Sequence, residues 1–210
     1  MTGRPPAPAP KRRYAPRLAP EQRREHLLDC ALRIVVRDGY DRISVGAIAK
    51  EAGVTRPVVY SVFDDLDALM DALLRRTRDR GLEQALRVLA EAGGPEDLGA
   101  WLTAAFSRLI DQVREDPYVW RPILGLTHGA PVAVHQQLEQ TRAVVRRHIA
   151  AGLRQALDLR GGPDLDAEVL SHLVLVTAEE FGRLALDDSA RFDKERLVAA
   201  LRGLLALARR

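Results

Sequence analysis

The residue types best suited to chemistry lie in the short segment from Thr55 to Ser61. Arg56 can donate two parallel hydrogen bonds to guanine O6 and N7, and Val58 with Pro57 can contact a thymine methyl group. The hydroxyl group of Tyr60 suits phosphate oxygens. On one face of a short helix, this set is typical of recognition in a DNA major groove rather than of covalent catalysis.

Two short helices joined by a tight turn are expected to position these side chains, over residues 44–63. Ser44 and Thr55 are predicted N-caps, because a hydroxyl can accept a backbone N–H from the first helical turn. Gly53 ends the first helix, since glycine adopts the left-handed conformation of a helix C-terminus without a Cβ clash. The apolar residues at helical spacing, which should face the core, are Val45, Ile48, Ala49, Val59 and Phe63.

The sequence I-A-x-E-A-G-V-T-x-x-x-x-Y-x-x-F, followed by D-L-D-A-L, resembles the helix-turn-helix of tetracycline-repressor (TetR) type regulators from about Glu21 to Leu74. The resemblance implies an all-α dimer whose second domain holds an inducer. It also implies that a helix over residues 66–92 links the two domains. Val62 and Leu66 depart from the family pattern, which commonly has histidine and lysine there, so two of its phosphate contacts are lost.

The predicted fold is all-α, with a three-helix DNA-binding domain over residues 20–65 and a larger helical ligand-binding and dimerisation domain over residues 66–210. No segment shows the alternating pattern of a strand. Apolar periodicity and Gly/Pro breaks place further helices near residues 96–114, 117–124, 132–157, 164–186 and 193–208.

Basic residues concentrate at the N-terminus. Residues 1–60 contain 12 Lys/Arg and 6 Asp/Glu, whereas residues 61–210 contain 20 and 23. Residues 1–19 carry five prolines and no acid, which predicts a disordered basic arm. The arm could contact DNA phosphates or the minor groove, or it could be a solubilising tail. The full set of predicted DNA contacts is Ser44, Thr55, Arg56, Pro57, Val58, Tyr60 and Ser61, with Arg12, Arg13 and Arg17 from the arm.

The second domain is expected to serve two purposes. Its last two helices carry apolar stripes that would form a four-helix interface with a second copy; the alternative is a monomer that buries them. The aromatic middle helices favour a pocket for a small hydrophobic effector, although such residues can also simply fill a core. The predicted pocket residues are Trp101, Phe106, Ile110, Trp120, His128, Leu138 and Thr141.

Several functional classes are disfavoured by the sequence. No cofactor motif or histidine spacing for a metal occurs, and the lone Cys30 lies in an apolar run that favours a buried hydrophobe over a redox switch. Glu179, Glu180 and Arg183 form a simple helical ion-pair pattern, so an enzyme is not expected. We expect a cytoplasmic homodimer that binds a palindromic double-stranded DNA operator and is released by the effector. The alternative is a DNA-binding regulator that has no small-molecule pocket and is either controlled by a protein partner or constitutively active.

Overall fold

The computed structural model describes residues 19–160 and 165–207. In these ranges the chain forms helices and short turns, with no strand. The elements are α1 (Pro20–Asp38), the 3-10 turn η1 (Tyr40–Arg42), α2 (Val45–Glu51), α3 (Arg56–Tyr60), α4 (Leu66–Glu91), α5 (Leu98–Glu115), α6 (Pro117–Ile123), α7 (Val132–Arg160), α8 (Ala167–Asp187) and α9 (Lys194–Leu207). The all-α prediction is confirmed.

Side-chain caps fix where many of these helices begin. The Ser44 hydroxyl accepts the Ala47 backbone N–H at 3.1 Å, and Asp65 accepts the Ala68 N–H at 2.7 Å. Asp97 and Asp166 cap α5 and α8 in the same way. Because a cap precedes the first helical residue, α5 and α8 begin two or three residues later than the periodicity predicts.

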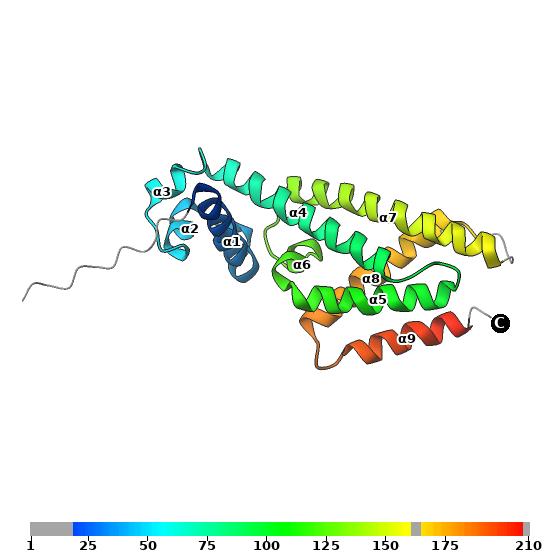
Figure 1. The fold of residues 1–210 in the computed structure, drawn as a ribbon. Coiled ribbons are helices and arrows are strands. Elements are labelled where there is room, and N and C mark those ends of the chain that lie inside the picture. The colour runs from blue at the N-terminus through cyan, green and yellow to red at the C-terminus, as the bar shows by residue number, and fades with distance from the viewer. Residues whose placement is uncertain (1–18, 161–164, 208–210) are drawn as a thin grey trace, which may run out of the picture.

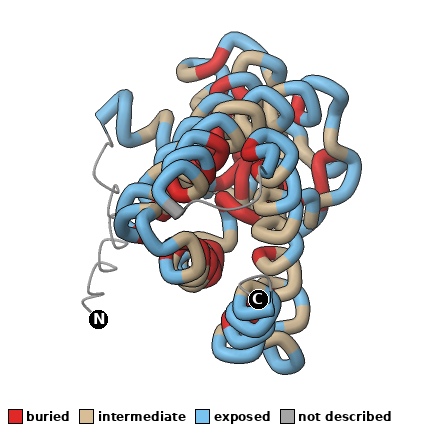
Figure 2. Tube along the Cα trace, turned by 90° about the vertical axis from the view of Figure 1, so that its right-hand side faces the viewer, coloured by how far each residue is buried: buried red, intermediate tan, exposed pale blue. Residues whose placement is uncertain are grey.

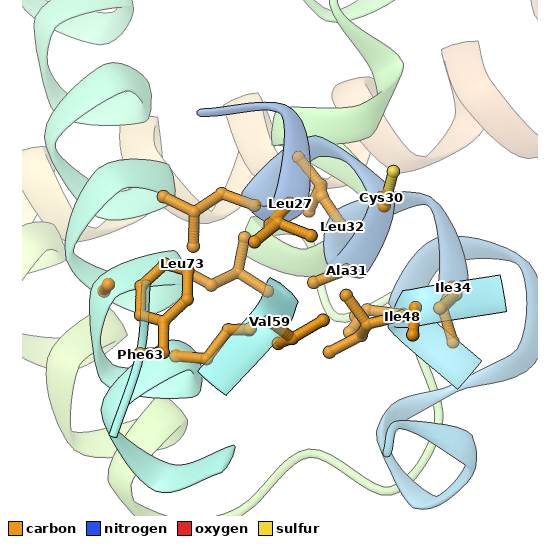
Figure 3. Packing of buried hydrophobic residues seen from close by; sticks show 14 of the residues in the cluster. Leu27, Cys30, Ala31, Leu32, Ile34, Ile48, Val59, Phe63 and Leu73 are labelled. Atoms are coloured by element: carbon orange, nitrogen blue, oxygen red, sulfur yellow. The ribbon is translucent and has the colours of Figure 1, made fainter. Parts of the chain in front are cut away.

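Helices α1, α2 and α3 form a small unit, here called the head, at one end of the molecule (Figure 1). Its core is apolar and closely packed, as Figure 3 shows for Leu27, Ile48, Val59 and Phe63. The start of α4 completes this core through Leu69 and Leu73, among others. Cys30 is buried in it, and burial raises the pKa of the thiol, which disfavours the reactive thiolate.

Helices α4 to α9 form the larger unit, here called the body, in which α5 is central. Helix α5 packs against α4, α8 and α9, and α7 packs along α8. Buried residues gather between these helices, while α9 lies to one side with much of its surface exposed (Figure 2). Helix α4 runs from the head into the body, as the family resemblance implies (Figure 1).

Candidate DNA-binding face and internal cavity

Helix α3 presents the predicted recognition side chains to solvent. Val59 is 1% exposed and anchors the helix in the head core, whereas Tyr60 is 53% exposed. Arg56 and Pro57 are exposed and Val58 is half-buried. The alternation follows from helical periodicity: one face packs on α1 and α2, and the opposite face stays free to enter a groove.

The hydroxyl groups near α3 differ in what they can offer to a phosphate, which only accepts hydrogen bonds. Thr55 occupies the predicted N-cap position, but its side chain makes no capping bond. Ser44 accepts a bond as a cap and keeps its own proton available. The Ser61 hydroxyl donates to the Val58 carbonyl at 2.7 Å, so its proton is already used. The geometry therefore favours Ser44 and Thr55 over Ser61 as phosphate donors.

Arg56 folds back over α2. A Cβ built on Gly46 would lie 2.8 Å from the Arg56 Nη2 atom, so the absence of a side chain at position 46 makes room for the guanidinium group. Sequence reasoning did not single out Gly46. Gly46 could have been noticed in the sequence, because a glycine inside a helix lowers stability and therefore suggests that a side chain has no room there.

A set of ion pairs behind the reading helices links α1 to α2. Glu51 accepts bonds from Arg33 Nε at 3.3 Å and Arg37 Nη1 at 3.2 Å. These hydrogen bonds, the one from Arg33 first, lower the pKa of Glu51. The sequence pattern gave no sign of this brace, because its partners lie 18 and 14 residues apart. The arm residues Arg12, Arg13 and Arg17 lie outside the described residues.

The body contains a cavity of about 90 Å³ between α4, α5, α6, α7 and α8. Five predicted pocket residues line it: Trp101, Phe106, Trp120, Leu138 and Thr141. Two predictions are corrected by the structure. Ile110 packs instead with Ala185, Leu197 and Val198, since it lies on the side of α5 that faces α9. His128 lies in the loop before α7 and contacts the head.

The cavity wall is apolar except near Thr141, Arg142 and Glu179. Arg142 donates from Nε and Nη2 to the two oxygens of Glu179, at 2.6 and 3.2 Å. Its Nη1 donates to Glu139 at 2.6 Å. Burial lowers the pKa of Arg142, but these bonds outweigh it and hold the pKa above its ordinary value. Glu179 therefore differs from the solvated residue that its sequence neighbours suggest, whereas Glu180 does pair with Arg183 at 2.9 Å.

The loop between α6 and α7 connects the cavity to the head. Ile123 and Leu124, at the end of α6, line the cavity. A few residues later the His128 carbonyl accepts the Tyr40 backbone N–H at 2.9 Å. The phenol of Tyr40 also hydrogen-bonds the Thr127 side chain; burial outweighs this bond and raises the pKa of Tyr40 to about 12. Val134, in the first turn of α7, belongs to the head core.

Comparison with known proteins agrees with this arrangement. Residues 27–73 match the family model "Bacterial regulatory proteins, tetR family". The chain is 34% identical over 119 residues to the transcriptional activator FasR of Mycolicibacterium smegmatis, a segment that covers 55% of this chain and 52% of FasR. It is 42% identical over 53 residues to the regulator AcrR of Shigella flexneri, covering 25% of each chain. The chain thus spans about half or less of the length of these relatives.

The fold resembles that of solved regulators. Bacillus subtilis FadR, solved in complex with stearoyl-CoA, has a TM-score of 0.66 and 16% sequence identity, with 86% of this chain and 96% of FadR covered. The shared feature is the fold, a helix-turn-helix head on a larger helical body. Residues 27–73 therefore form a DNA-binding domain of the TetR type. In the described part of the chain, no helix is long and apolar enough to span a membrane.

Proposed function

We propose that this protein is a dimeric, sequence-specific DNA-binding repressor that a small hydrophobic effector releases from a palindromic operator. The observation that carries the proposal is the geometry of α3. Val59 anchors the helix, whereas Arg56 and Tyr60 are exposed and Val58 is half-buried on the free face that a major-groove reader requires. Arg56 reads a guanine, Val58 with Pro57 contacts a thymine methyl group, and Ser44, Thr55 and Tyr60 bind phosphates.

Exposed apolar side chains on α8 and α9 support dimerisation. Val169, Leu173 and Val176 are 56%, 61% and 61% exposed and follow one another at spacings of four and three along one face of α8. Leu204 and Leu207 of α9 are 65% and 69% exposed. A second copy would bury these faces against its own, and the two heads would then read two half-sites related by two-fold symmetry.

The cavity is the proposed effector site. Its lining is almost entirely apolar, and both tryptophans of the chain belong to it. Stearoyl-CoA, the molecule bound to the fold neighbour FadR, is far larger than a 90 Å³ space. An effector with more bulk than the cavity must displace its wall.

Helix α6 forms part of the cavity wall, and the loop that follows it is hydrogen-bonded to Tyr40 of the head. An effector that moves Ile123 or Leu124 therefore also moves Thr127 and His128, and with them the head. Helix α4 provides a second route, as in the family, because Gly81 and Ala85 of α4 line the same cavity. Effector and operator then weaken each other's binding by the same factor.

Selection of bound DNA from a random pool, followed by fluorescence anisotropy across a salt series, tests the proposal. We expect a palindrome that binds at least about 10³-fold more tightly than random DNA. Hydrophobic compounds should then release it and change the tryptophan fluorescence. Specific DNA binding without any fluorescence response would favour the alternative of control by a protein partner. Weak binding without sequence preference would contradict the repressor proposal.

A further inference from the structure

The polar groups at the cavity limit the chemistry of its ligand. Among the described residues that line it, most N–H and O–H donors already have partners. The Trp120 indole donates to Gln84 Oε1 at 2.8 Å, and the Thr141 hydroxyl donates to the Gln137 carbonyl at 3.0 Å. Three of the five N–H groups of Arg142 donate to two carboxylates. A ligand that needs donors from these side chains must use the two remaining N–H groups of Arg142 or break one of the bonds.

Hydrogen-bond acceptors are still available at the cavity, on the carboxylate of Glu179. Each oxygen of Glu179 accepts one bond from Arg142, and an ionised carboxylate offers about four acceptor positions. The Glu179 side chain is 15% exposed, so water satisfies it only in part. A ligand that brings its own N–H donors can therefore bind Glu179 without disturbing the Arg142 pair.

The charged side chains beside the cavity also favour a ligand with a cationic group. Arg142 contacts both Glu139 and Glu179, and the three side chains together carry one net negative charge. A cationic group beside Glu179 makes the cluster neutral. An anionic group makes it doubly negative and shares one guanidinium with two carboxylates, one of which, Glu179, is mostly buried.

The size of the cavity limits the rest of the ligand. An apolar cavity of about 150 Å³ binds benzene. The space of about 90 Å³ here is smaller, so even a single ring must move the cavity walls, and a larger apolar body must move them further.

We propose that the effector is a small weak base, with an apolar body about the size of one ring and one ammonium group that binds Glu179. This inference rests on the proposed function, in which the cavity is the effector site.

Three probes that share one ring and differ in their polar group test it: benzylamine, benzyl alcohol and benzoate. Binding is followed by calorimetry and by the fluorescence of Trp101 and Trp120, the two tryptophans of the chain, up to about 10 mM, where fragments of this size are expected to bind. We expect benzylamine to bind at least about ten-fold more tightly than benzoate. This comparison needs no variant, so it does not depend on mutant folding.

Glu179→Gln should weaken benzylamine binding about ten-fold and leave benzyl alcohol unaffected. Glu180→Gln is the matched control, because Glu180 is the adjacent carboxylate, pairs with Arg183 and does not line the cavity. Equal or tighter binding of benzoate, or an unchanged preference in Glu179→Gln, would overturn the inference and leave the effector site standing. Failure of all three probes to bind would overturn the effector site as well.

Discussion

The contact between the α6–α7 loop and the head can be tested by adding a single methyl group. Gly129 has a φ of +71°, and a Cβ there would lie 2.5 Å from Oδ2 and 2.6 Å from Cγ of Asp41, which is in the head. Gly125, in the same loop, has a φ of +73°, but a Cβ there would meet no atom within 4 Å. The two glycines share a backbone conformation and differ in whether the head is near.

Replacement of either glycine by alanine forces a side chain into the left-handed region, which costs about 1–2 kcal/mol. Gly129→Ala must also move the exposed Asp41 carboxylate group, and a forced change of its side-chain rotamer costs about 0.5–1.5 kcal/mol more. We therefore expect the free energy of unfolding to fall by about 1–2 kcal/mol in Gly125→Ala and about 1.5–3.5 kcal/mol in Gly129→Ala.

Urea unfolding at constant pH measures both values, and Asp41→Ala completes a double-mutant cycle. In the Asp41→Ala background, Gly129→Ala should cost no more than Gly125→Ala, because the carboxylate it would meet is gone. If Gly125→Ala and Gly129→Ala cost the same in the wild-type background, or if Asp41→Ala gives no rescue, the loop does not contact the head as described. In anisotropy titrations, the same Gly129→Ala variant should show reduced release by effector while still binding the operator.

Further predictions concern the reading helix, the interface, the arm and a buried tyrosine. Arg56→Ala should weaken operator binding by about 1–3 kcal/mol and relax specificity at one base pair per half-site, as measured on a panel of operator variants; a uniform loss across all sequences would make Arg56 a phosphate contact. Leu173→Glu should shift light scattering from dimer to monomer, and a wild-type monomer at micromolar concentration would exclude the dimer altogether. Removal of residues 1–18 should weaken DNA binding and flatten its salt dependence, whereas unchanged affinity would make the segment a tail. Because the folded pKa of Tyr40 is raised to about 12 from 10, the stability it contributes is complete below pH 10 and falls as the pH rises toward 12, by up to about 3 kcal/mol. Tyr40→Phe should flatten that part of the unfolding profile, and an identical profile would refute the assignment.

Local pattern was enough to predict the head. Ser44 caps α2, Thr55 occupies the N-cap position of α3, and Val59 and Phe63 face the core, because caps and helical periodicity act over three or four residues. The same reasoning predicted the all-α class and the extent of α4. The resemblance to the TetR-type DNA-binding domain followed from the spacing of the turn itself, and residues 27–73 match that family model.

Tertiary packing decided what local pattern could not. Glu179 has neighbours in sequence that suggest a solvated pair, yet it turns to Arg142, 37 residues away, since the packing of α7 against α8 brings the two together. His128 has the character of a polar pocket residue, but its loop reaches the head. Ile110 continues an apolar stripe, and only the position of α9 assigns it to a different cluster.

The sequence by itself therefore determined the helices, the exposed face of α3 and the TetR-type DNA-binding domain, because those depend on contacts within a few residues. Only the tertiary structure decided the cavity, the charge beside it and the contact from α6 to the head. These features depend on side chains that lie far apart in the chain and meet when whole helices pack.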